Sequence, residues 1–130
     1  MSIREVPPDG WRSFLERFSG EHRGWRATIH GVERGFAVTR VPSEAIKAIT
    51  LERHGPYAMM RLTFLNGVSL CAPGARALRV QQTVDGADRA LEIELNDGAF
   101  IRVAFRAAAR PEQVDGIAPA ELADEVWVLL

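Results

Sequence analysis

Met60-x-Leu62-x-Phe64-x-Asn66-Gly67-Val68-x-Leu70-x-Ala72 is the stretch that decides the fold of this chain. A second stretch aligns with it without a gap, at the spacing that separates Gly67 from Gly98: Leu91-x-Ile93-x-Leu95-x-Asp97-Gly98-Ala99-x-Ile101-x-Val103. Apolar residues at every second position around a glycine-containing turn are typical of antiparallel hairpins. The pattern therefore predicts an internal repeat, in which a meander of three strands is made twice.

The register of each hairpin follows from the alternation of its apolar residues. A two-residue turn would place the apolar face of one strand against the polar face of the other. Three-residue loops, residues 65–67 and 96–98, pair apolar with apolar residues instead. The predicted pairs are Phe64 with Val68, Leu62 with Leu70, Leu95 with Ala99 and Ile93 with Ile101. Such loops need a left-handed residue at their third position, so we expect a positive φ at Gly67 and Gly98.

An amphipathic helix precedes the strands. Trp11, Phe14, Leu15 and Phe18 are spaced as one helical face, and polar residues occupy the other. The pattern predicts an extended arm over residues 1–8 and a helix over residues 9–19, with Asp9 as its N-cap and Ser19-Gly20 as its end. A helix this short is marginal alone, so its aromatic face is expected to cover the sheet, with a role in partner binding as the alternative.

Further strands fill residues 24–106. Three are predicted before the first repeat, over residues 25–30, 36–41 and 46–52, and the third is broken by His54-Gly55-Pro56. Residues 107–130 are read as a C-terminal loop, a short helix and an apolar tail. This tail packs back onto the domain or joins a second subunit as a homodimer, and its residues are Val126, Trp127, Val128, Leu129 and Leu130.

These elements predict a single α+β domain over residues 1–130. An N-terminal helix packs on a curved, mostly antiparallel sheet of about seven or eight strands, and partial closure of that sheet into a barrel is an alternative. An edge strand of an open sheet is a second candidate surface for a homodimer, because edge strands present unpaired backbone groups.

Composition restricts the function classes. A net charge of −1 gives no electrostatic footprint for nucleic acid or for an acidic membrane surface. Cys71 is the single cysteine, the first residues contain no apolar signal core, and no run reaches membrane-spanning length. We therefore expect a cytoplasmic protein with neither nucleic acid nor membrane as a partner.

The chain contains no catalytic motif. It has no glycine-rich phosphate loop, nucleophile elbow or zinc-binding helix motif, and His22, His30 and His54 are isolated in the sequence. We therefore predict no metal, cofactor or catalytic residue. Acidic residues around the second repeat are read as turn residues, with metal binding as the alternative: Asp85, Asp88, Glu92, Glu94 and Asp97.

The remaining polar candidates are for ligand binding. His54 and Tyr57 flank a strand end, and an arginine patch for an anion is a second possibility. Glu92 is expected opposite Arg102, and such a pair is typical of the solvated face of a sheet. This acidic neighbour argues against an anion-binding arginine patch. The candidate ligand-binding residues are His54, Tyr57, Arg61, Arg79 and Arg102, with Arg106 as a further member of the arginine patch.

Four groups of residues resemble a family of small bacterial proteins of unknown function. They are Trp11-x-x-Phe14-Leu15-x-x-Phe18-Ser19, Val41-Pro42-x-x-x-Ile46-x-x-Ile49, Arg76-x-Leu78-x-Val80 and Leu91-x-Ile93-x-x-x-x-Gly98-x-x-Ile101-x-Val103. The resemblance covers about residues 11–106 and implies a Trp/Phe helix followed by strands. It implies no reaction, cofactor or substrate, and Leu70, Cys71 and Gly74 stand where the family commonly has a histidine.

Three functional hypotheses follow. The first is a non-enzymatic binding or protein-interaction module of the bacterial cytoplasm, suggested by a strong core pattern without a catalytic constellation. The second is a carrier of a small apolar ligand in a cavity enclosed by the sheet, suggested by the aromatic residues. The third is an enzyme whose site lies near His54 or near the turns at Asp85 and Asp97.

Overall fold

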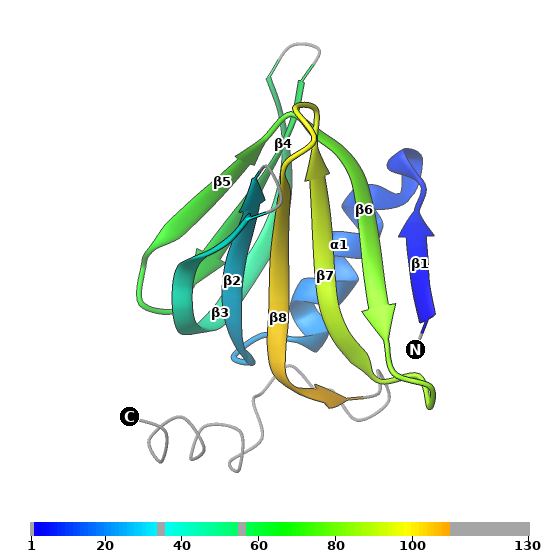
Figure 1. Ribbon diagram of the computed structural model, residues 1–130, viewed down its shortest axis with the longest axis vertical. Helices are drawn as coiled ribbons and strands as arrows, with labels where there is room; N and C mark the ends of the chain where they lie inside the picture. The colour runs from blue at the N-terminus through cyan, green and yellow to red at the C-terminus, as the bar shows by residue number, and fades with distance from the viewer. Residues whose placement is uncertain (1, 34–35, 55–56, 110–130) are drawn as a thin grey trace.

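One helix packs on a single antiparallel sheet of eight strands in the computed structural model, which describes residues 2–33, 36–54 and 57–109 (Figure 1). The predicted α+β class and N-terminal helix are confirmed. The order β1-β6-β7-β8-β2-β3-β4-β5 places β1 and β5 at the two ends of an open sheet, so the partly closed barrel is wrong. The strands are β1 Ser2–Val6, β2 Arg26–Glu33, β3 Phe36–His54, β4 Tyr57–Phe64, β5 Ser69–Pro73, β6 Ala75–Gln82, β7 Asp88–Leu95 and β8 Phe100–Ala109.

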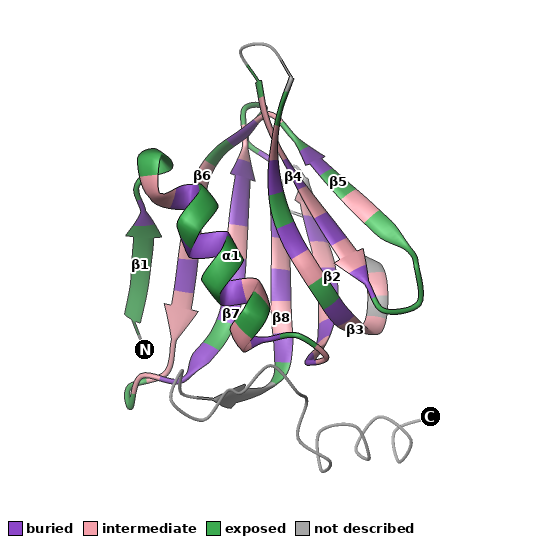
Figure 2. Cartoon of the chain, turned by 180° about the vertical axis from the view of Figure 1, so that it is seen from behind, coloured by how far each residue is buried: buried purple, intermediate pink, exposed green. Residues whose placement is uncertain are grey.

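Helix α1 (Trp11–Glu21) covers one face of the sheet, as its apolar stripe predicts (Figure 2). A single turn of 3-10 helix, Pro8–Gly10, leads into it. The four residues of the stripe are all buried, and they join the core residues that the strands present on the same face. The amphipathic pattern therefore places this helix correctly on the sheet.

The predicted helix ends are wrong by a few residues. Asp9 lies in the 3-10 turn, and the N-cap is Gly10, which makes no side-chain capping bond. At the other end the helix continues through Ser19 and Gly20 to Glu21. The hydroxyl of Ser19 does not compete for the backbone of its own helix, because it accepts a hydrogen bond from the Ile49 N–H at 2.8 Å and donates one to the Ile49 carbonyl at 3.0 Å.

The second and third predicted strands form one continuous strand, β3, of 19 residues. Pro42 suggests a break because proline removes a ladder hydrogen bond. The structure places it in an irregularity: Ala27 of β2 pairs with Glu44, and Ile29 pairs with Val41. Two residues of β3 thus face one of β2, and the strand passes through the proline without ending.

Strand β3 changes partner halfway along its length. Residues 36–45 pair with β2, and residues 46–54 pair with β4. The edge of β3 that β2 leaves free is met by α1 through the Ser19 hydroxyl at Ile49 and through Arg12 Nη1, which lies 3.5 Å from the Leu51 carbonyl oxygen. A helix laid over a strand edge protects it from pairing with another chain.

The two hairpins have the predicted loops and registers. In the first hairpin (β4–β5) the Phe64 N–H donates to the Val68 carbonyl at 2.9 Å, and Leu62 pairs with Leu70. In the second hairpin (β7–β8) the Leu95 N–H donates to the Ala99 carbonyl at 2.8 Å, and Ile93 pairs with Ile101. Gly67 has φ = 90° and Gly98 has φ = 88°, so the expectation of positive φ is confirmed.

The N-terminal arm, predicted as extended over residues 1–8, is part of the sheet. Residues 2–6 form β1 and pair antiparallel with β6 from Ser2↔Gln82 to Val6↔Leu78. The indole N–H of Trp11 donates to the Val6 carbonyl at 2.8 Å and fixes the step from β1 into the helix. The arm is extended as expected, but its partner lies so far along the chain that no local pattern reveals it.

Strand β8 continues to Ala109, past the predicted boundary at residue 106. The predictions for the short C-terminal helix and for the tail Val126–Leu130 lie outside the described residues. No helix among residues 2–33, 36–54 and 57–109 combines the length and the apolar character needed to cross a lipid bilayer.

Candidate functional sites

His22, the C-cap residue of α1, is a buried histidine with 1% of its surface exposed. Its Nδ1 lies 2.8 Å from the Phe18 carbonyl oxygen. Because a carbonyl oxygen only accepts hydrogen bonds, Nδ1 carries the hydrogen of this bond. The other ring nitrogen, Nε2, is therefore the atom that is available for a second partner.

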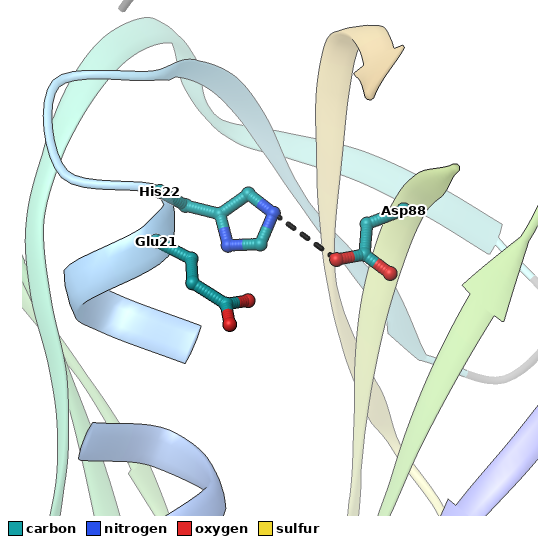
Figure 3. A group of neighbouring side chains, drawn as sticks. All are labelled: Glu21, His22 and Asp88. Atoms are coloured by element: carbon teal, nitrogen blue, oxygen red, sulfur yellow. Dashed lines mark ion pairs between the residues drawn. The ribbon is translucent and has the colours of Figure 1, made fainter. Parts of the chain in front are cut away.

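The Nε2 atom of His22 points at the carboxylate of Asp88, the first residue of β7 (Figure 3). The distance from Nε2 to Asp88 Oδ2 is 3.3 Å, and the two side chains are 1% and 6% exposed. The geometry of this ion pair does not amount to a hydrogen bond, and Nε2 is buried without a hydrogen-bond partner. The other carboxylate oxygen, Oδ1, accepts a hydrogen bond of 2.7 Å from Gln82 Nε2.

Three aromatic rings hold the imidazole in place. Its centroid lies 4.1 Å from that of Phe18 and 4.7 Å from that of Phe105, both in stacked geometry, and 5.8 Å from that of Trp25 at a steep angle. Such packing leaves the ring little freedom to rotate. The imidazole of His22 therefore has a fixed orientation at the junction of the helix and the sheet.

Glu21 completes a group of three ligand-type side chains. One ligand atom from each of Glu21, His22 and Asp88 lies within 4.8 Å of the others (Figure 3). A cavity of about 230 Å³ adjoins the group, and Glu21 and Asp88 are part of its wall. The remaining lining residues are Arg4, Phe14, Arg17, Phe18, Val80 and Gln82.

Two arginines give this cavity a cationic side. The guanidinium carbons of Arg4 and Arg17 lie 5.9 Å and 5.7 Å from the ring centroid of Phe14, within cation–π range. Arg17 Nε is also 3.8 Å from Glu21 Oε1. The imidazole and the two carboxylates of Glu21, His22 and Asp88 are groups that can bind a proton or a metal cation. None of the three residues is a nucleophilic serine, threonine or cysteine.

A second candidate site lies at the opposite end of β7, near Leu95. An open groove of about 470 Å³ is formed by the start of β4, the turn after β5 and the loop of the second hairpin. Tyr57 is 60% exposed beside it. The lining residues are Tyr57, Met59, Pro73, Gly74, Leu95, Asn96 and Asp97.

Strand β5 borders this groove and is one of the two edge strands of the sheet. It contains no charged residue, whereas β1 at the opposite end contains Arg4 and Glu5. Val68, just before β5, is 50% exposed, and the thiol of Cys71 is also exposed. Proteins usually protect an edge strand with charges, so β5 is the less protected of the two edges.

The structure separates the residues predicted to bind a ligand. His54 and Tyr57 pair at the ends of β3 and β4, and Tyr57 lines the groove. Arg61 lies further along β4. Arg79 and Arg102 flank Glu92 on neighbouring strands, and three inter-strand spacings, about 14 Å, separate β8 from β4.

Arg61, Arg79 and Arg102 each have a carboxylate partner. Arg61 Nε donates to Glu52 Oε1 at 2.9 Å, and this hydrogen bond, with the negative charge of Glu52, raises the pKa of Arg61. Arg102 Nη1 donates to Glu92 Oε1 at 2.7 Å, which confirms the expected cross-strand pair. Arg79 lies 3.4 Å from Glu5 and 3.0 Å from Glu94.

Glu94 is the most strongly paired of the acidic residues around the second hairpin. Its carboxylate accepts hydrogen bonds from Arg76 Nε at 2.6 Å and from Arg79, and these bonds lower the pKa of Glu94. Asp85 and Asp97 belong to turns at opposite ends of β7, about 23 Å apart for a strand of that length. The acidic residues therefore do not form one cluster.

Sequence reasoning missed the contact between His22 and Asp88. It treated His22 as isolated, because Asp88 lies on a strand far along the chain. One local signal was available: His22 follows Phe18 by four positions and so continues the buried stripe of α1. A polar side chain on a buried helical stripe needs a partner, but its identity depends on the strand order.

Comparisons with known proteins give little further information. No protein-family model matches the chain, and no curated protein matches it. Among solved structures it is similar to "Crystal Structure of Bacillus subtilis YojF protein", with a TM-score of 0.48 and 11% sequence identity, over 80% of this chain and 94% of that chain. This likeness carries no argument about function, and the resemblance to a bacterial family stays a prediction.

Proposed function

We propose that this protein is a non-enzymatic protein-interaction module of the bacterial cytoplasm that pairs with a second copy of itself along β5. The observation that carries the proposal is the uncharged edge of β5 beside an apolar groove. Strand addition at an open edge gains main-chain hydrogen bonds, and a neighbouring pocket adds selectivity for a side chain.

The backbone of β5 suits a twofold axis at Cys71. The Val68 carbonyl points to β4, and alternation along the strand then directs the backbone groups of Ser69 and Cys71 outward. Two copies of Cys71 placed opposite each other exchange two N–H···O bonds. In the same register the Ser69 N–H donates to the carbonyl of Pro73 in the second copy, while the Ser69 carbonyl receives no hydrogen bond in return because proline has no N–H.

In this register, Val68 of one copy lies beside the groove of the other copy. The register places Val68 of one copy opposite Gly74 of the other, and Gly74 lines the groove. The exposed apolar side chains of Leu65 and Val68 lie at this end of the first hairpin, 51% and 50% exposed. Their burial against the second copy would add apolar contact to the backbone pairing.

The two alternative functions have less support. The face of the sheet on which a carrier would hold its ligand is covered by α1 and its aromatic stripe (Figure 2). The turns at Asp85 and Asp97 are too far apart to act on one substrate, because acid–base partners must reach the same reacting group. An interaction surface requires neither an enclosed cavity nor a catalytic pair.

Light scattering coupled to size-exclusion chromatography tests the proposal. We expect the wild-type protein to be a dimer at high micromolar concentration. Cys71→Lys places two like charges opposite each other and should raise the dimer dissociation constant by at least about tenfold. Ile3→Lys changes an exposed apolar residue on the other edge strand, β1, and should leave the dimer intact. A monomeric wild type would contradict the proposal.

Oxidative cross-linking tests the register. Directly opposed residues of an antiparallel pair have Cα atoms about 5.5 Å apart, within the range that a disulfide spans. Mild oxidation should therefore link two wild-type chains through Cys71. The variant with Cys71→Ser and Ser69→Cys carries its thiol on the same face but about 13 Å from its symmetry mate, and should not cross-link. Equal cross-linking of both proteins would refute this register.

A further inference from the structure

We infer that Glu21, His22 and Asp88 form a binding site for one divalent transition-metal ion of the Zn²⁺ type. The inference is independent of the dimer at β5, because its residues lie on α1 and β7, and four strands separate β7 from β5 in the sheet. It joins two observations: three ligand atoms within 4.8 Å of one another, and a buried imidazole nitrogen without a hydrogen-bond partner.

The distance between the two buried donors matches a tetrahedral metal. Two ligands held about 2.0–2.1 Å from a tetrahedral Zn²⁺ lie about 3.3 Å from each other. His22 Nε2 and Asp88 Oδ2 are 3.3 Å apart. The separation of these two atoms therefore matches that of two ligands on one tetrahedral ion.

The groups behind these ligands have the arrangement that metal sites require. A histidine that binds metal through Nε2 usually donates its Nδ1 hydrogen to a carbonyl or carboxylate, and a ligating carboxylate is itself hydrogen-bonded. His22 Nδ1 donates to the Phe18 carbonyl at 2.8 Å, and Asp88 Oδ1 accepts from Gln82 at 2.7 Å. Each residue thus has one side-chain atom fixed by a hydrogen bond, and its second atom, His22 Nε2 or Asp88 Oδ2, remains as a metal ligand.

Charge favours a cation at this position. His22 Nε2 faces the Asp88 carboxylate, and Glu21 adds a second acidic side chain nearby. Two arginines lie on the same side: Arg17, 3.8 Å from Glu21, and Arg4, which lines the adjoining cavity. A divalent ion would compensate both carboxylates and give the buried Nε2 atom a partner.

The adjoining cavity provides a fourth coordination position. Three protein ligands with one open position are typical of zinc sites that bind an exchangeable molecule. Glu21 and Asp88 line the cavity of about 230 Å³, which has room for water at the metal. The rings of Phe18 and Phe105 stack against the imidazole.

Titration of Zn²⁺ into chelator-treated protein, in competition with a zinc indicator, tests the site. The Cys71→Ser background removes the free thiol as a competing ligand. We expect one Zn²⁺ per chain, and at least tenfold weaker binding for Glu21→Gln and for Asp88→Asn. Glu16→Gln, an exposed residue of the same helix, is the matched control and should bind as the parent does. Circular dichroism confirms that each variant is folded.

Nitrogen NMR of the histidine side chains separates the metal site from a simple ion pair. Zn²⁺ should shift the Nε2 signal of His22, whereas the signals of His30 should not move. The inference is overturned by the absence of stoichiometric binding, or by equal affinity of the two ligand variants and the parent. It is also overturned by a His22 imidazole that remains protonated at both nitrogens when Zn²⁺ is present.

Discussion

The first and second hairpins have the same turn and the same register, but their surroundings differ. The second hairpin lies inside the sheet, with β6 on one side and β2 on the other, whereas β5 of the first hairpin has a neighbour on one side only. Ala99 of the second hairpin is 8% exposed, and Val68 at the equivalent position of the first is 50% exposed. Local pattern thus determines how a hairpin pairs, and the strand order determines how much of it is buried.

The largest expected difference between the hairpins concerns equivalent core positions. Ile101→Ala in the second hairpin should lower the free energy of unfolding by about 2–5 kcal/mol, because it leaves a cavity between two flanking strands. Leu70→Ala in the first hairpin removes a half-buried side chain at the edge and should cost only about 1 kcal/mol. Urea unfolding followed by circular dichroism measures both. Equal losses would show that the edge is as tightly packed as the centre.

A smaller effect is expected where α1 holds the part of β3 that supports the first hairpin. Ser19→Ala leaves the N–H and the carbonyl of Ile49 without the hydroxyl that they both contact, at a cost of about 1–3 kcal/mol. The control Ser13→Ala removes an exposed hydroxyl on the same helix and should change stability by less than about 0.5 kcal/mol.

Amide hydrogen exchange then locates the effect of Ser19→Ala. Faster exchange should appear in β4 and in the second half of β3, while β7 and β8 keep the protection of the wild type. Uniformly faster exchange throughout the sheet would mean that Ser19 supports the whole fold rather than the attachment of the first hairpin.

The smallest effect is expected for a charge that only the second hairpin has. Glu94 aligns with Thr63 of the first hairpin, and its hydrogen bonds with Arg76 and Arg79 lower its pKa from the ordinary value of 4.5. The stabilisation from Glu94 is therefore present above pH 4.5 and is lost as the pH falls through the lower value of the folded state. Glu94→Gln should flatten the acid side of the stability profile in urea titrations, and an unchanged profile would contradict this assignment.

The parts of the fold that were predictable depend on neighbours in sequence. Alternation around Gly67 and Gly98 specifies both loops and registers, and the spacing of Trp11 to Phe18 specifies the buried face of α1. The continuous β3 was missed because a proline in a bulge has the same local appearance as a proline that ends a strand.

The candidate sites were less accessible than the fold. Tyr57 was selected and lines the groove, but the contact of His22 with Asp88 depends on how α1 sits over β7. The pairing of β1 with β6 has the same character, since α1 and four strands separate these two strands along the chain. The pattern of a single sequence predicts the buried faces of helices and strands and the positions of turns. It does not predict which elements far apart in the sequence pack or pair together.

The ladder between β2 and β8 has a consequence for how the chain reaches this structure. Five of the seven ladders in the described sheet join consecutive strands, and only β1–β6 and β2–β8 join distant ones. Loop-closure entropy is therefore concentrated in these two ladders, and six register pairs, from Ala27↔Phe105 to Val32↔Phe100, unite two meanders that are each of low contact order.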